Sequence, residues 1–217
     1  MTEIVVFVGD LGSGKTTIVK LINAIVKQER PDIPTVANID LGSSARKVED
    51  TNKFIAIKLI KEDKKYAMVT TDEAAQAGLE SRGSGSKSQA LETRVITLAR
   101  KAHVDDLIVS QLMSMIDKRA QWLANEYVLC EAKFDSDNFT IAPDYFEYTV
   151  YDSNLKEING FTLEAADCAK YLWPDMDTDD IPFAQALKAQ WIHYYDIAPA
   201  DEAEFIDIME GPAQKGV

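Results

Sequence analysis

A glycine-rich turn followed by a lysine and two threonines stands near the start of the chain, in the stretch GDLGSGKTT at residues 9–17. It follows an apolar run and matches the pattern G-x-x-x-x-G-K-[ST] at every fixed position. Such a loop points successive backbone N–H groups at a phosphate, and a helix that begins at Lys15 adds its positive end. The Lys15 ammonium would reach the β- and γ-phosphates, and the Thr16 hydroxyl would bind Mg²⁺. The predicted nucleotide-binding residues are Gly9, Asp10, Leu11, Gly12, Ser13, Gly14, Lys15, Thr16 and Thr17.

Two adjacent acidic residues end a second apolar run, in YAMVTTDE at residues 66–73. Ligands of open α/β sheets bind at the carboxyl ends of the strands, so this strand would bring Asp72 to the phosphate loop. We expect Asp72 to hold Mg²⁺ through water, and Glu73 to polarise a water molecule for attack on the γ-phosphate. The alternative is that both acids cap the next helix. The matching phosphate loop favours the catalytic interpretation.

A glutamine closes a third apolar run, DLIVSQ at residues 106–111. If this strand lies beside the strand at 66–71, the amide of Gln111 would lie near the γ-phosphate and could hydrogen-bond the attacking water. Otherwise Gln111 is only a polar residue at the end of a strand.

The remaining motifs separate the classes of enzyme that use such a loop. A GTPase would need the guanine-reading motif N/T-K-x-D, and NKFI at 52–55 lacks the aspartate. A small-molecule kinase usually has an arginine-rich lid, whereas the Gly/Ser-rich stretch 78–88 holds only Arg82. Hydrolysis is therefore favoured. The alternatives are a small nucleotide or metabolite kinase, and an ATP-dependent assembly or signalling switch.

Hydrophobic periodicity predicts an α/β fold with a mostly parallel central sheet flanked by helices. The predicted strands cover 3–8, 35–41, 66–74, 106–111 and 126–134. The predicted helices cover 15–28, 50–65, 89–103 and 114–124, with a loop at 78–88. The stretch 50–65 is ambiguous: its length and lysine flanks favour a helix, but FIAIKLI at 54–60 alone could be a strand. The apolar face of the first helix would consist of Ile18, Leu21, Ile22, Ile25 and Val26.

The pattern changes after about residue 137. Alternating aromatic residues at 138–163 predict an antiparallel hairpin, and Thr162 would cap a helix running to Trp173, with Glu164 near its positive end. Two amphipathic helices, 183–195 and 201–210, would close the chain. Without an internal repeat or a clear linker, we expect one domain over 1–217. Its nucleotide-binding core would be 1–135, and its C-terminal hairpin and helical extension 136–217.

Composition sets further bounds on the chain of 217 residues. Net charge is −13, yet the 19 acidic and 5 basic residues from Glu131 onward account for all of it. The rest is nearly neutral, which leaves room for a local basic surface that contacts phosphate. Cys130 and Cys168 lack metal-ligand spacing and are expected to be reduced thiols. No run approaches the ~18–20 apolar residues of a membrane span, and no signal peptide is evident, so we expect a cytoplasmic protein.

Four features in order, GDLGSGKT, VTTDEAAQ, the Gly/Ser loop with Arg82, and LARKAHVDDLIVSQ, resemble the FtsK/HerA superfamily of P-loop ATPases. The resemblance covers roughly residues 3–134. It is strongest to the small genome-packaging ATPases of archaeal and other double-jelly-roll viruses and to Zot-like proteins. It implies a RecA-like core and a homo-oligomeric ring, often a hexamer. It also implies hydrolysis of ATP with Mg²⁺ that moves double-stranded DNA into a capsid, with a capsid or portal protein as partner. A viral member would act in the host cytoplasm or with the virion.

The resemblance also implies roles for individual residues. Lys15 and Thr16 match the phosphate and magnesium positions, Asp72 the metal carboxylate, Glu73 the catalytic glutamate and Gln111 the sensor amide. A neighbouring subunit would complete each site with an arginine. Arg100 suits this role, and its rivals are Arg94, Arg82 and Arg119. The implied contacts with the DNA phosphate backbone are Arg82, Lys87, Lys118 and Arg119.

Overall fold

The computed structural model describes residues 2–72, 98–116, 118–134 and 143–175, all within the compact unit Met1–Asp177. Its strands are β1 (Ile4–Val8), β2 (Thr35–Ala37), β3 (Arg46–Lys47), β4 (Ala67–Thr71), β5 (Val104–Ser110), β6 (Glu126–Lys133), β7 (Tyr145–Asp152) and β8 (Glu157–Glu164). Its α-helices are α1 (Lys15–Glu29), α2 (Thr51–Ile60), α4 (Lys118–Leu123) and α5 (Ala165–Tyr171). Short 3₁₀ turns are η1 (Gly42–Ser44), η3 (Arg100–Ala102), η4 (Met113–Met115) and η5 (Trp173–Asp175).

Within these residues the strands form one sheet in the order β3-β2-β4-β5-β1-β6-β7-β8. The pairs from β3 to β6 are parallel, and β6-β7-β8 are antiparallel, which confirms the predicted hairpin. β5 lies between β1 and β4, with Ser110 beside Val8 and Ile108 beside Thr71. The strand that precedes Gln111 therefore pairs with the strand that precedes Asp72, as the sensor hypothesis required.

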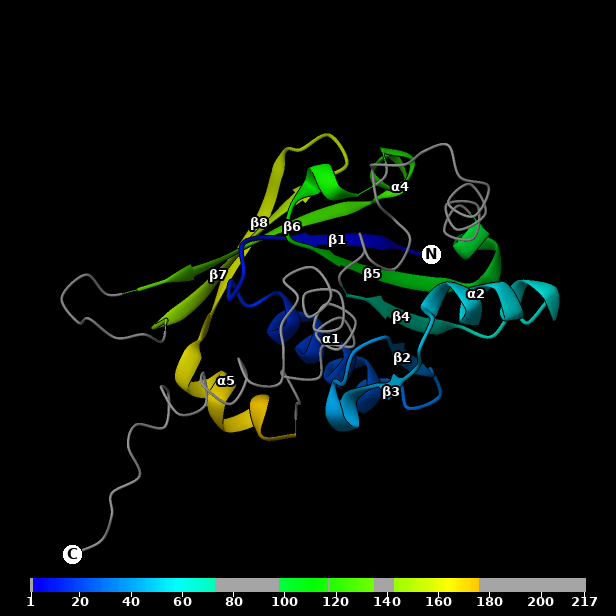
Figure 1. Cartoon of the computed structure of the whole chain (residues 1–217), viewed down its shortest axis with the longest axis horizontal. Coiled ribbons are helices and arrows are strands. Elements are labelled where there is room, and N and C mark those ends of the chain that lie inside the picture. The colour runs from blue at the N-terminus through cyan, green and yellow to red at the C-terminus, as the bar shows by residue number, and fades with distance from the viewer. Residues whose placement is uncertain (1, 73–97, 117, 135–142, 176–217) are drawn as a thin grey trace, which may run out of the picture. The chain divides into compact units, whose positions relative to one another are not determined.

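Helices cover both faces of the sheet, α1 and α5 on one side and α4 on the other (Figure 1). Alternating side chains supply the two cores, since successive strand residues point to opposite faces. Phe7, Leu107 and Val128 pack toward α1 and α5, whereas Ile4 and Ile108 pack toward α4. Ile55 of α2 joins a further cluster with Val69 and Val104.

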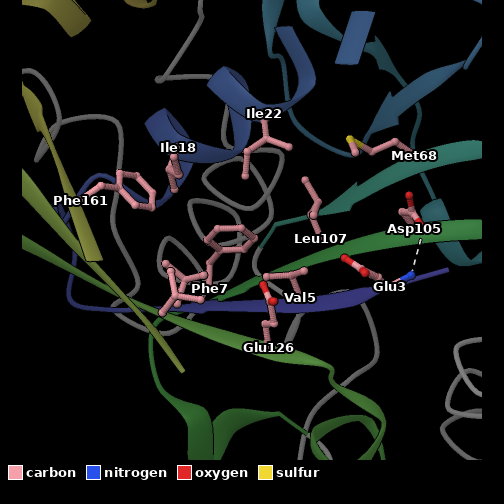
Figure 2. A pocket seen from close by; sticks show the side chains of 12 residues that line it. Glu3, Val5, Phe7, Ile18, Ile22, Met68, Asp105, Leu107, Glu126 and Phe161 are labelled. Carbon is pink, nitrogen blue, oxygen red and sulfur yellow. Dashed lines mark hydrogen bonds between the residues drawn. The ribbon is translucent and has the colours of Figure 1, made fainter. Parts of the chain in front are cut away.

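A cavity of about 250 Å³ lies between α1 and the sheet (Figure 2). Ile18 and Ile22 line it from α1, Phe7 from β1, and Phe161 from β8. The hairpin thus reaches the same side of the sheet as the first two turns of α1. In the described ranges, no helix is long and apolar enough to cross a membrane.

Four of the five residues predicted for the apolar face of α1 pack on the core, namely Ile18, Leu21, Ile22 and Val26. The expectations for Ile25 and for the cap of α5 are wrong. Ile25 is 45% exposed, and the buried side of α1 includes the polar residues Lys20 and Asn23. Asn23 Nδ2 donates to Thr70 Oγ1 at 2.9 Å, so this side of the helix is tied to β4. Thr162 caps nothing because it lies within β8. That strand continues to Glu164, the residue that precedes α5.

The predicted strands and the predicted helices at 15–28, 50–65 and 114–124 are reproduced with shifted ends, whereas most of the predicted helix 89–103 lies outside the described residues. The second strand is shorter than predicted, residues 50–65 contain the favoured helix, and α4 is preceded by η4. Both cysteines are free and buried. Burial raises the pKa of Cys130 to about 12, so this thiol stays protonated. The loop 78–88 and the closing helices 183–195 and 201–210 lie outside the described residues, and the single-domain expectation stays a prediction.

Candidate functional site

The glycine-rich turn has the backbone geometry that its sequence predicted. Gly12 and Gly14 have φ angles of +77° and +85°, a region that side chains with a Cβ rarely adopt. Gly14 immediately precedes α1, so the first N–H groups of that helix point into the turn. A Cβ on Gly9 would lie 2.2 Å from the carbonyl oxygen of Cys130, so the backbones of the turn and β6 can approach only because that position is glycine.

The Lys15 ammonium is folded back onto the turn. Its Nζ donates to the carbonyl oxygens of Gly9 at 2.7 Å and Asp10 at 2.6 Å, with the Ser13 hydroxyl 3.3 Å away. The positive charge is therefore held inside the curl of the backbone, where phosphate oxygens could take the place of the carbonyl groups. These residues fit a bound triphosphate.

The predicted metal ligands meet at the same edge of the sheet. Thr16 Oγ1 lies 3.5 Å from Asp72 Oδ2, although 56 positions separate them in the sequence. Neighbouring oxygens around an octahedral Mg²⁺ lie about 3 Å apart, since each Mg–O distance is about 2.0–2.1 Å. A hydroxyl and a carboxylate at this spacing fit that ion as ligands, directly or through water.

The sequence analysis missed Asn38, which lies just beyond β2. Its Oδ1 accepts a hydrogen bond from the Asp72 backbone N–H at 2.7 Å, and its Nδ2 donates to the Asp72 carbonyl oxygen at 2.9 Å. One side chain therefore fixes both backbone groups of the predicted metal carboxylate. Nothing near Asn38 in the sequence signals this role, because its partner is 34 positions away.

Asn38→Ala is expected to raise the Mg²⁺ concentration that gives half-maximal nucleotide hydrolysis by about 10-fold or more. Groups that orient metal ligands typically contribute 10- to 100-fold in metal affinity or activity. The measurement is a Mg²⁺ titration of the hydrolysis rate. Asn159→Ala, at an exposed position of β8, is the matched control. Identical titrations for the two variants would show that Asn38 does not orient Asp72.

Gln111 is exposed at the carboxyl end of β5, directly after the residue paired with Val8. The strand register places it between the end of β1, where the turn begins, and the end of β4, where Asp72 follows. Glu73 lies outside the described residues, as do Arg82, Lys87 and Arg94.

Arg100 lies at the end of the sheet where β5 begins, opposite the end that carries the phosphate loop. It sits four residues before β5, and its Nη2 donates to the Leu123 carbonyl oxygen and to Asn125 Oδ1, both at 3.4 Å. Because β5 has seven residues and a strand rises ~3.3 Å per residue, Arg100 is on the order of 20 Å from Gln111. Lys118, which is exposed, and Arg119 begin α4.

Carboxylates are sparse at the described part of the site. In those residues, no group of three or more His, Cys, Asp or Glu side chains could hold a metal ion. The predicted oxygen ligands among the described residues are thus one hydroxyl and one carboxylate, a donor set that fits a nucleotide-bound Mg²⁺, whose shell phosphates and water would complete.

Comparison with solved structures finds proteins that share this fold. No protein-family model matches the sequence, and no curated protein matches it. Among solved structures, the genome-packaging NTPase B204 of Sulfolobus turreted icosahedral virus 2, in complex with ATPγS, is similar. The TM-score is 0.51 at 14% identity, over 72% of this chain and 95% of that chain.

Two further solved structures have a similar fold. The N-terminal domain of zonular occludens toxin from Neisseria meningitidis has a TM-score of 0.51 at 16% identity, over 76% of this chain and 93% of that one. The ATPase domain of another protein has a TM-score of 0.51 at 10% identity, over 75% of this chain and 81% of that one. The predicted RecA-like P-loop fold, with its mixed and mostly parallel sheet, is confirmed. Identities this low establish a shared fold, and function needs separate argument.

Proposed function

We propose that this chain is a Mg²⁺-dependent ATPase that moves double-stranded DNA, and that it packages a viral genome into a capsid. The observation that carries the proposal is the convergence of the phosphate loop and Asp72, with Thr16 Oγ1 and Asp72 Oδ2 3.5 Å apart. The similarity of the fold to that of a genome-packaging NTPase supports the choice of substrate.

In this proposal the described side chains divide the work of binding. Lys15 releases the Gly9 and Asp10 carbonyl oxygens and contacts the β- and γ-phosphates. Thr16 and Asp72 hold Mg²⁺, which would neutralise phosphate charge when bound. Glu73 accepts a proton from the attacking water, and the Gln111 amide holds that water or the γ-phosphate. The structure describes nothing of Glu73, so its role rests on the sequence.

A ring of identical subunits would explain why Arg100 lies far from the phosphate loop of its own subunit. Arg100 is at the edge of the sheet away from its own phosphate loop, so it cannot reach the triphosphate of its own subunit. In the proposed ring, the end of the sheet that carries Arg100 would face the loop of the neighbouring subunit, and a guanidinium placed in this way contributes about 10³–10⁵ in rate. Arg82, Arg94 and Arg119 remain the rival residues.

DNA would be held through its backbone phosphates. Lys118 and Arg119 at the start of α4, with Arg82 and Lys87, would supply the charge. The remaining elements of the proposal are a ring that is often hexameric, a capsid or portal protein as partner, and a location in the cytoplasm or with the virion.

The test is the steady-state rate of ATP hydrolysis with and without duplex DNA, measured over salt concentrations of about 50–300 mM. Duplex DNA is expected to stimulate hydrolysis, and the stimulation should fade as salt rises because phosphate contacts release counterions. Lys118→Ala should reduce the slope of log DNA affinity against log salt concentration by about one.

The contrary outcomes are specific. A slow rate that duplex DNA leaves unchanged at every salt concentration would favour the ATP-dependent switch. Transfer of phosphate to a nucleoside or metabolite in place of water would favour the kinase. Lys156→Ala, in the exposed turn of the hairpin, is the control for a general change in charge. It should leave the salt dependence unchanged.

A further inference from the structure

A hydroxyl group of the C-terminal hairpin reaches the phosphate loop. Tyr148, on β7, is fully buried, and its Oη donates a hydrogen bond to the Gly14 carbonyl oxygen at 3.0 Å. The two residues are 134 positions apart, so the extension meets the residue that precedes α1. Burial raises the pKa of Tyr148, which keeps the hydroxyl protonated as a donor in the neutral range.

The Gly14 carbonyl belongs to the same peptide group as the Lys15 N–H. A trans peptide group is planar, so its N–H points away from its C=O. Two donors hold this carbonyl, Tyr148 Oη and the Ile18 N–H, each at 3.0 Å. With the carbonyl directed into the helix and the hairpin, the Lys15 N–H points out of the end of α1, toward an anion.

Other aromatic residues of the extension brace the same turn of helix. A Cβ on Gly14 would lie 2.5 Å from Phe146 Cδ1, so the ring of Phe146 lies directly against this glycine. Phe146 meets Trp173 edge-on, with ring centroids 6.3 Å apart, and Trp173 Nε1 donates to Thr17 Oγ1 at 3.1 Å. Phe161 of β8 shares the cavity beside α1 with Ile18, as Figure 2 shows.

We propose that Tyr148 is a positioning residue of the nucleotide site, whose hydroxyl orients the Gly14–Lys15 peptide so that the Lys15 N–H binds phosphate. The hairpin is thus part of the site as well as part of the sheet. This inference rests on the proposed function, because it assumes that the loop binds a nucleoside triphosphate.

The experiment is Tyr148→Phe in the full chain, which removes one oxygen atom and keeps the packed ring. We expect the affinity for ATPγS with Mg²⁺ to fall about 3- to 10-fold, the value of one hydrogen bond. KM for ATP should rise by a similar factor, and kcat at saturation should be retained. The urea midpoint of unfolding without nucleotide is measured in parallel.

Tyr127→Phe is the matched control. Tyr127 is also buried, and its Oη donates to a backbone carbonyl oxygen, that of Gln121, at 2.5 Å. It packs on the α4 side of the sheet, away from the phosphate loop. Its loss should lower the urea midpoint by a comparable amount and leave the affinity for ATPγS unchanged.

The results of these measurements test the positioning role of Tyr148 separately from the proposed function. If Tyr148→Phe lowers the midpoint but binds ATPγS like the wild type, or if both variants lose affinity equally, the positioning role is overturned. In the wild type, the Lys15 amide resonance should move when ATPγS is added, and an unmoved resonance also overturns it. A wild-type chain that binds no ATPγS overturns the proposed function itself, so the two failures can be distinguished.

Discussion

Glu73→Gln is expected to leave ATP bound and to slow its hydrolysis about 10²–10⁴-fold, the usual contribution of a general base. Glutamine keeps the size and one acceptor oxygen of glutamate, but its NH₂ group is a donor and the neutral amide cannot accept the proton of the attacking water. Glu73 follows Asp72, whose carbonyl oxygen is held by Asn38 and whose carboxylate lies 3.5 Å from Thr16 Oγ1. The measurement is single-turnover hydrolysis together with the equilibrium affinity for ATP.

Two comparisons make the Glu73 result interpretable. Lys15→Ala should weaken ATP binding itself, because it removes the charge held at the Gly9 and Asp10 carbonyl oxygens. Glu49→Gln, at an exposed position before α2, should hydrolyse ATP at the wild-type rate. A Glu73→Gln chain with a normal rate would remove Glu73 from the mechanism, and the water would then need another base.

Asp106→Asn is expected to stabilise the fold by up to about 4 kcal/mol at pH 8, and by much less at pH 4. Asp106, in the middle of β5, is 1% exposed, and its Oδ1 has no hydrogen-bond partner. It lies between Ile4 and Val69 in the sheet, and burial raises its pKa from 3.8 to about 7. The folded state therefore favours the protonated carboxyl group.

The sign of the pH dependence follows from that shift. Below pH 3.8 the carboxyl group is protonated in both states and carries no penalty. As pH rises toward 7 the unfolded chain ionises while the folded chain does not, so stability is lost until the folded group also ionises. Asparagine does not titrate, so the difference in unfolding free energy between variant and wild type isolates this charge.

The measurement is denaturant unfolding of both chains from pH 4 to pH 8. Asp105→Asn is the neighbouring control, because its partly exposed carboxylate accepts the Glu3 N–H at 2.9 Å. That variant should show no gain in stability at pH 8. A constant difference between Asp106→Asn and wild type across the range would mean that the Asp106 carboxyl group is paired or solvated.

Local patterns in the sequence were sufficient wherever one short segment makes a feature by itself. The phosphate loop is such a case, because its glycines and the N-terminal end of α1 are contiguous, and the structure has the backbone that the pattern predicted. The strand before Asp72 could also be read locally. Its five buried residues form a continuous apolar and threonine run, as a central parallel strand requires.

Local signals failed where a neighbouring element decided the outcome. Thr162 has the side chain of a helix cap, yet pairing with β7 extends β8 past it to Glu164. Ile25 fits an apolar helical face, but the side of α1 that meets β4 carries Lys20 and Asn23 instead. Periodicity correctly predicted that Ile18, Leu21, Ile22 and Val26 pack on the core, whereas packing against the sheet left Ile25 exposed and buried two polar residues.

The sequence by itself determined that a P-loop begins the chain, that Asp72 follows a central strand, and that a hairpin follows the core. Only the tertiary structure decided that β5 separates the strands of the loop and of Asp72, that Asn38 fixes Asp72, and that Tyr148 reaches Gly14. The physical reason is how far apart in the sequence the interacting residues lie. Backbone conformation and burial leave periodic signals along a segment, whereas hydrogen bonds between residues 34 or 134 positions apart leave none.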